Sequence, residues 1–115
     1  MSTVFPPDPA RVVLVVEDEP VLRASIVRGL SKLPGLDVAE AGTVRDAKAL
    51  IRSLDANLLI SDLDLPDGSG IELAAELDRC NKRVPIVFVS AFLREYQGQL
   101  PDRPNIDVYE KPVRS

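Results

Sequence analysis

The chain has 115 residues, 45% of them apolar, which is enough for one domain with a modest core. Its 14 basic and 18 acidic residues give a net charge of −4, which argues against nucleic-acid binding by this segment. The absence of His excludes histidine catalysis and phosphohistidine donation, and the single Cys80 excludes an internal disulfide. No apolar run approaches the ~20 residues of a membrane span. Because the first residues lack the pattern of a secretion signal, we expect a cytoplasmic protein.

Strand and helix signals alternate along the chain. Residues 1–10 contain three Pro and are expected to form an extended arm, so that the predicted domain covers residues 11–115. Apolar runs predict five strands, at 11–16, 36–39, 57–61, 84–89 and 106–109. Apolar residues at helical spacing predict helices at 20–33, 43–54, 69–80 and 92–100. This alternation predicts an α/β fold, a doubly wound parallel sheet with helices on both faces.

Polar side chains follow four of the five predicted strands. They are Glu17 and Asp18 after the first strand, Asp62 after the third, Ser90 after the fourth and Lys111 after the fifth. The carboxyl ends of parallel strands lie at one edge of a sheet, where open α/β sheets bind their ligands. We therefore expect these side chains to converge.

This set of side chains indicates phosphoryl chemistry. Crowded carboxylates raise one another's pKa unless a cation joins them, and oxygen ligands without His or Cys nearby favour Mg²⁺. A Lys and a hydroxyl beside that cation are donors for a phosphoryl group, and Asp is a known covalent acceptor of phosphate. The pattern predicts phosphoryl transfer onto Asp62, with Mg²⁺ on one side and Lys111 on the other.

Four motifs carry a resemblance to a known family. They are Val-Leu-Val-Val-Glu-Asp-Glu-Pro at 13–20, Asp-Leu-Asp-Leu-Pro-Asp-Gly-Ser-Gly at 62–70, Val-Ser-Ala at 89–91 and Lys-Pro at 111–112. In this order and spacing the chain resembles the receiver domain of two-component response regulators, over about residues 11–112. The resemblance implies a five-stranded, flavodoxin-like sheet of order 2-1-3-4-5. In that family a fifth helix follows Lys-Pro, and it is expected to be missing here because the chain stops at Ser115.

The resemblance also implies roles at the acidic end of the site. Asp62 matches the phosphoacceptor and is one of the metal ligands. Asp18 matches the direct Mg²⁺ ligand, Glu17 holds the metal through water, and the backbone carbonyl of Asp64 completes the protein ligands.

On the other side of the site, Ser90 matches the hydroxyl that moves toward the phosphoryl group, and Lys111 matches the family's cation. The peptide before Pro112 is cis in the family. Asp64 and Phe92 occupy positions at which the family tunes the lifetime of the phosphate.

Two departures from the family pattern stand out. Three residues before Lys111 the family usually has an aromatic switch residue, but this chain has Val108, with Tyr109 one place later. Because neighbouring strand residues face opposite sides, Tyr109 is not expected to fill that place. The second departure is the missing helix, which leads us to expect self-association over the uncovered sheet face.

Three functions are compatible with these patterns. The first is a phosphoacceptor, itself not an enzyme beyond assisting its own phosphorylation and dephosphorylation, with a sensor histidine kinase or a histidine phosphotransfer protein as partner. The second is a phosphatase, since Asp62-Leu-Asp64 resembles the Asp-x-Asp start of haloacid-dehalogenase-type enzymes. Pro66 stands where that family has Thr or Val, and the acidic pair of this chain comes early. The third is a docking domain that keeps the fold but never carries phosphate, which Val108 keeps open.

Overall fold

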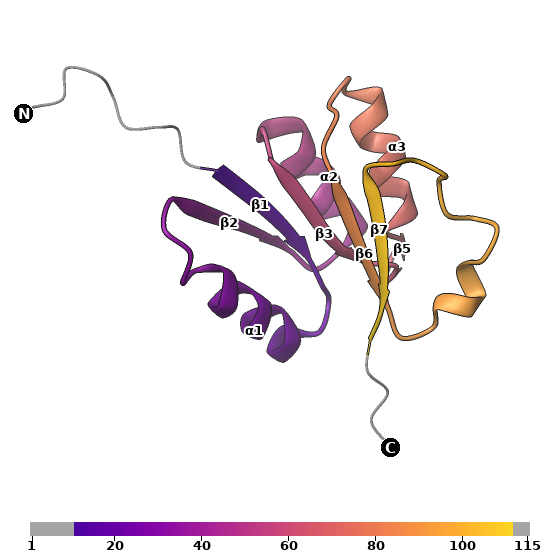
Figure 1. Ribbon diagram of the computed structural model, residues 1–115, viewed down its shortest axis with the longest axis horizontal. Coiled ribbons are helices and arrows are strands. Elements are labelled where there is room, and N and C mark those ends of the chain that lie inside the picture. Colours follow the sequence, from indigo (N-terminus) through magenta and orange to yellow (C-terminus); the bar gives the residue numbers. More distant parts are fainter. Residues whose placement is uncertain (1–10, 112–115) are drawn as a thin grey trace, which may run out of the picture.

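The computed structural model describes residues 11–111 (Figure 1). The expected N-terminal arm, and the expected cis peptide before Pro112, lie outside the described residues.

A parallel sheet of five strands forms the centre of the domain. The strands are β1 (Arg11–Val16), β2 (Leu36–Ala41), β3 (Leu58–Asp62), β6 (Ile86–Ser90) and β7 (Ile106–Glu110). Their order is β2-β1-β3-β6-β7, which is the predicted order 2-1-3-4-5. A short antiparallel hairpin, β4 (Asp64–Leu65) with β5 (Gly68–Ser69), lies in the connection after β3 and was not predicted.

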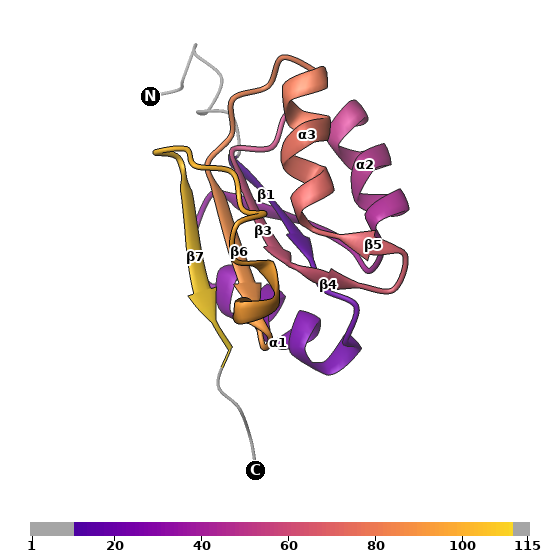
Figure 2. The same ribbon diagram turned by 90° about the vertical axis from the view of Figure 1, so that its right-hand side faces the viewer.

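Helices cover both faces of the sheet, as predicted. The α-helices are α1 (Pro20–Leu30), α2 (Val44–Ser53) and α3 (Ile71–Arg79). Figures 1 and 2 show α2 and α3 side by side on one face and α1 on the other. No residue of α1 is fully buried, whereas α2 and α3 bury apolar stripes against the sheet. The α1 face is therefore the more open of the two.

The prediction of a helix over 92–100 is wrong. The chain forms only a short 3-10 helix there, η1 (Leu93–Tyr96), inside the connection from β6 to β7. Gly98 has a φ of +85°, a left-handed conformation that ends helical winding, and Pro101 follows. Helix α1 also ends three residues before the predicted Leu33.

The helix starts are fixed by side chains that accept backbone hydrogen bonds. Glu19 accepts from the backbone N–H groups of the first turn of α1, and Thr43 Oγ1 accepts from Asp46 N at 3.0 Å. Asp67, from the connection after β3, accepts from Val44 N at 2.7 Å and from Arg45 N at 2.9 Å. The start of α2 is thereby tied to the segment that follows Asp62.

The register of β7 decides where Val108 and Tyr109, the first departure from the family pattern, lie in space. Val89 pairs with Tyr109 and Phe88 pairs with Val108, without a bulge. Val108 packs against the hydrophobic core, whereas Tyr109 is 59% exposed. Tyr109 therefore does not fill the place of Val108, as expected from the alternation of strand residues.

Candidate functional site

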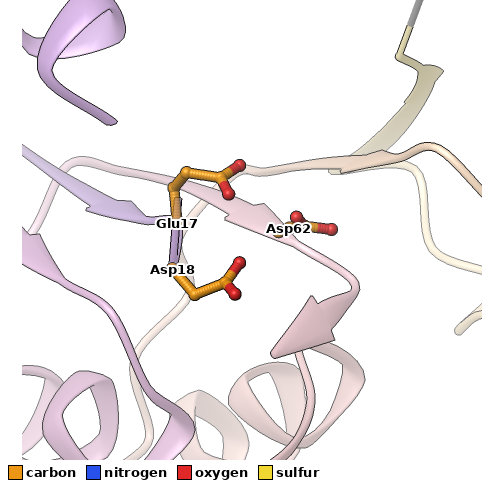
Figure 3. A group of neighbouring side chains, drawn as sticks. All are labelled: Glu17, Asp18 and Asp62. Atoms are coloured by element: carbon orange, nitrogen blue, oxygen red, sulfur yellow. The ribbon is translucent and has the colours of Figure 1, made fainter. Parts of the chain in front are cut away.

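Three carboxylates meet at the carboxyl edge of the sheet. Glu17 and Asp18 directly follow β1, and Asp62 is the last residue of β3. One carboxylate oxygen from each lies within 4.8 Å of the others, and Figure 3 shows the three groups around a common space. Glu17 and Asp62 are buried and Asp18 is exposed, so that the cluster is open to solvent on the Asp18 side.

Lys111 brings one positive charge into this cluster. Its Nζ lies 2.7 Å from Asp62 Oδ2 and 2.8 Å from Glu17 Oε1. Its backbone N–H donates to the carbonyl of Ser90 at 2.8 Å, which continues the pairing of β6 with β7 by one residue. The predicted convergence of the first, third and fifth strands is thus present as direct contacts.

The acidic side chains of the site outnumber its positive charges. Burial raises the pKa of Glu17 although Lys111 and the backbone N–H of Glu19 donate hydrogen bonds to it. Burial alone would lower the pKa of Lys111, but hydrogen bonds to Asp62 and Glu17 outweigh this effect, and the Lys111 pKa is raised. Lys111 therefore stays charged at neutral pH, and the buried acid beside it is left short of positive charge.

Close packing holds the backbone of Asp62 in place. Ser61 Oγ donates to the Asp62 carbonyl at 2.8 Å. A Cβ atom at Gly70 would lie 2.3 Å from the same carbonyl oxygen, so only glycine allows the chain to approach this closely. The backbone N–H of Asp64 donates to Asp62 Oδ1 at 2.9 Å, and this bond orients the carboxylate.

Arg23 supports the acidic pair and was missed by the sequence analysis. Its guanidinium donates to the backbone carbonyl of Glu17 at 2.8 Å and pairs with Glu40 at 3.3 Å. It thereby links α1 and β2 to the turn that carries Glu17 and Asp18. An Arg on a helix carries no periodic signal for such a contact, so this role could not be predicted from the sequence.

Ser90 is fully buried at the end of β6, but its hydroxyl is engaged with Asp64. Ser90 Oγ donates to Asp64 Oδ2 at 3.1 Å and accepts from Phe92 N at 2.9 Å. The other oxygen of Asp64 accepts a short hydrogen bond from the Tyr96 hydroxyl. This bond, and then burial, raise the pKa of Tyr96 to about 12, so that the phenol keeps its proton at neutral pH. Tyr96 was not among the predicted site residues.

The donor set fits a hard divalent cation. Three carboxylates within reach of one another, without His or Cys, match the oxygen ligands of Mg²⁺. Glu17 and Asp62 already bond to Lys111, whereas within residues 11–111 no hydrogen bond engages the Asp18 carboxylate. Asp18 is therefore the acid best placed to receive a cation from solvent.

A hollow leads from this cluster along the α1 face of the sheet. It has a volume of about 630 Å³ and reaches Asp62 and Lys111 at one end. Its walls are mainly apolar and come from α1 and from the strands β1, β3 and β6; they include Val21, Leu22, Ile26, Ile60 and Val89.

A doubly wound sheet of order 2-1-3-4-5, with acids and a lysine at its carboxyl edge, defines a class of signalling domains of flavodoxin-like fold. Comparison with known families gives the same result: the family model described as the response regulator receiver domain matches residues 13–113. The chain belongs to this family, and the cluster of Glu17, Asp18 and Asp62 is typical of its phosphorylation site.

Individual relatives agree with this assignment. The chain is 30% identical over 79 residues to the response regulator protein PilR of Pseudomonas aeruginosa, covering 69% of this chain and 18% of PilR. It is 32% identical over 107 residues to the positive alginate biosynthesis regulatory protein of the same organism, covering 90% of this chain and 42% of that protein. The chain thus spans less than half the length of these curated relatives.

Solved structures show the same fold. The response regulator TrrA of Thermotoga maritima, in complex with Mg²⁺–BeF, matches with a TM-score of 0.72 and 27% identity, over 90% of this chain and 87% of that chain. The anti-anti-sigma factor PhyR of Bartonella quintana matches with the same TM-score and identity, over 91% of this chain and 43% of that one. Within residues 11–111, none of the helices has the length and apolar character needed to cross a membrane.

Proposed function

We propose that this chain is a phosphoacceptor that takes a phosphoryl group onto Asp62 from a phosphohistidine of another protein. The observation that carries the proposal is the placement of the Lys111 amine 2.7 Å from Asp62 Oδ2, inside a cluster of three acids. A structural ion pair alone would not need two further carboxylates beside it, because uncompensated acids at close range repel one another.

In the proposed reaction an Asp62 oxygen forms a bond to phosphorus as the bond between phosphorus and the donor imidazole breaks. The imidazole nitrogen leaves with the electron pair and takes up a proton. Lys111 stabilises negative charge on the phosphoryl oxygens, and the bond from Asp64 N keeps the Asp62 carboxylate oriented. Ser90 supplies a hydroxyl that can turn from Asp64 toward a phosphoryl oxygen.

Mg²⁺ would be held by Asp18 and Asp62 directly, by Glu17 through water and by the backbone carbonyl of Asp64. When bound, it supplies positive charge that neutralises the transferring phosphoryl group. What supports this assignment is the oxygen-only donor set and the excess of acid over base in the cluster.

The proposed donor is a sensor histidine kinase or a histidine phosphotransfer protein of the cytoplasm. These 115 residues contain no His, so the phosphohistidine must lie outside them. Self-association over the α1 face stays a prediction, to be checked by light scattering at high protein concentration; a strict monomer would contradict it.

The test uses a small phosphodonor, so that no partner has to be known. Incubation with acetyl phosphate and Mg²⁺ is expected to add one phosphoryl group, which intact-protein mass spectrometry detects and which hydroxylamine removes. Asp62→Asn should abolish the modification and keep the fold, because amide and acid have nearly the same shape. Asp55→Asn, at an acid that is 98% exposed, is the matched control and should be modified like the wild type.

The alternatives give different results in the same assay. Steady hydrolysis of a phosphate ester that depends on Asp62 and Asp64 would indicate a phosphatase. An intact fold without any modification would indicate a docking domain and would refute the proposal.

A further inference from the structure

One carboxylate, that of Asp64, joins the end of β6 to the connection that follows it. Ser90 donates to its Oδ2 at 3.1 Å, and Tyr96 of η1 donates to its Oδ1. The Tyr96 hydroxyl also lies 3.4 Å from the carbonyl of Leu63. A hydroxyl of the site and a phenol of the connection therefore share one acceptor.

We propose that Tyr96 is the positioning residue through which the Ser90 hydroxyl is coupled to the connection between β6 and β7. This inference rests on the proposed function, because it concerns what happens to Ser90 when a phosphoryl group stands on Asp62. It deepens that function by naming the side chain that carries the change away from the site.

Competition for a single proton is the physical basis of the coupling. Ser90 has one hydroxyl proton, and in this structure Asp64 accepts it. A phosphoryl group on Asp62 adds further charged acceptors nearby, which compete with the Asp64 carboxylate for this proton. When Ser90 turns toward them, the Asp64 carboxylate loses one of its two side-chain donors.

The loss of the hydrogen bond from Ser90 to Asp64 must then change the hydrogen bond from Tyr96 to the same carboxylate. Asp64 cannot move away freely, because its backbone N–H donates to Asp62 Oδ1 at 2.9 Å. Its carboxylate also comes close to the added negative charge, which changes its electrostatic surroundings. The hydrogen bond from Tyr96 is the remaining side-chain contact of that carboxylate within residues 11–111, so its length and strength must change.

Val108 and Tyr109, the two candidate residues on β7, cannot carry this change. Val108 has no polar group and packs against the core, and the Tyr109 side chain is 59% exposed. Tyr96, in contrast, is part of η1 and is separated from Ser90 by a single carboxylate. The connection is further anchored by Arg103, which pairs with Asp78 of α3, so that the movable part lies between Ser90 and Arg103.

The test follows the tyrosine hydroxyls directly. The full chain is prepared with ¹³C at the ring Cζ of tyrosine; the sequence has 2 Tyr, and Tyr109→Phe identifies the Tyr96 resonance. Mg²⁺ with beryllofluoride is added as a phosphoryl mimic, and ¹⁹F NMR records bound fluoride independently. In the wild type we expect the Tyr96 resonance to shift when fluoride binds.

Two variants separate coupling from proximity. In Ser90→Ala, at beryllofluoride concentrations at which ¹⁹F NMR shows the site occupied, the shift of Tyr96 should be lost. Ser31→Ala, at an exposed hydroxyl directly after α1, should keep it. In Tyr96→Phe, beryllofluoride should still bind. The changes in backbone amide chemical shift that its binding causes at residues 97–100 should be lost. If Ser90→Ala fails to fold, Tyr96→Phe still tests the coupling, because its readout does not depend on the Ser90 variant.

The outcomes are distinguishable. Bound fluoride with an unchanged Tyr96 resonance in the wild type, or with the same shift in Ser90→Ala, overturns the coupling and leaves the phosphoacceptor function standing. Absence of bound fluoride in the wild type overturns both, because no phosphoryl mimic then reaches Asp62.

Discussion

Two carboxylates of this domain, Asp62 and Glu76, are almost equally buried, at 6% and 5% exposed, but have opposite surroundings. Asp62 shares the single Lys111 with Glu17 and lies beside Asp18. Glu76 of α3 has two arginines to itself, Arg52 of α2 at 3.0 Å and Arg79 at 2.6 Å.

Under the proposed function, charge balance, more than burial, distinguishes the acceptor acid from a structural one. At Glu76 the hydrogen bonds from Arg52 and then from Arg79 lower its pKa to about 2, so that the acid is fully compensated. At the sheet edge, burial raises the pKa of Glu17 in spite of Lys111. The first arrangement fastens α2 to α3, whereas the second leaves an excess of negative charge, which the proposed function assigns to a cation and a phosphoryl group.

The largest expected effect comes from removing Lys111, the cation that contacts both Glu17 and Asp62. Lys111→Ala should lower the rate of labelling by acetyl phosphate by about 100-fold, the loss typical for one preorganised donor to a developing charge. Lys48→Ala, at a lysine of α2 that pairs with Glu72 of α3, is the matched control and should label like the wild type. Quantitative mass spectrometry over time measures both. Equal rates for the two variants would remove the distinction drawn between the two acids.

A second effect should appear in thermal stability when Glu76, the acid paired with two arginines, is substituted. Glu76→Gln removes two ion pairs of a buried carboxylate and should lower Tm by roughly 5 °C or more at pH 7. Labelling of Asp62 should be unaffected. Asp78→Asn, at a carboxylate that is 52% exposed and pairs with Arg103, is the control and should cost much less. A variant as stable as the wild type would mean that Glu76 is not a structural acid.

The pH dependence of the stability of the same variant tests whether folding lowers the pKa of Glu76. The pKa of Glu76 in the folded state, about 2, lies below its ordinary value of 4.5. Its contribution is therefore present above pH 4.5 and is lost as the pH falls toward 2. The urea midpoints of wild type and Glu76→Gln should differ at pH 7 and converge between these two values. A difference that grows on acidification would contradict the assignment.

The smallest expected effect is that of Mg²⁺ on the unbalanced site. A cation present at its Kd stabilises the folded state by about 0.4 kcal/mol, which corresponds to roughly 2 °C in Tm. Asp18→Asn should lose most of this rise, whereas Asp55→Asn should retain it. Thermal unfolding with and without Mg²⁺ measures the difference. An equal rise in Asp18→Asn would place the cation elsewhere.

Apart from the strand order, which only the family resemblance supplied, the sequence by itself determined the parallel sheet and the meeting of Glu17, Asp18, Asp62, Ser90 and Lys111 at one edge. These features follow from apolar runs, helical spacing and the rule that parallel strands end on the same side, all of which are written in local patterns. Val108 and Tyr109 were placed on opposite faces by the same alternation.

Only the tertiary structure decided the partners of individual side chains. The bonds of Asp64 to Ser90 and Tyr96, of Arg23 to the Glu17 carbonyl and of Glu76 to Arg52 join residues 6 to 32 positions apart, and no periodic pattern marks them. The same holds for the short 3-10 helix that stands where a longer helix was predicted. Such contacts depend on the distances between packed elements, which a local sequence pattern does not contain.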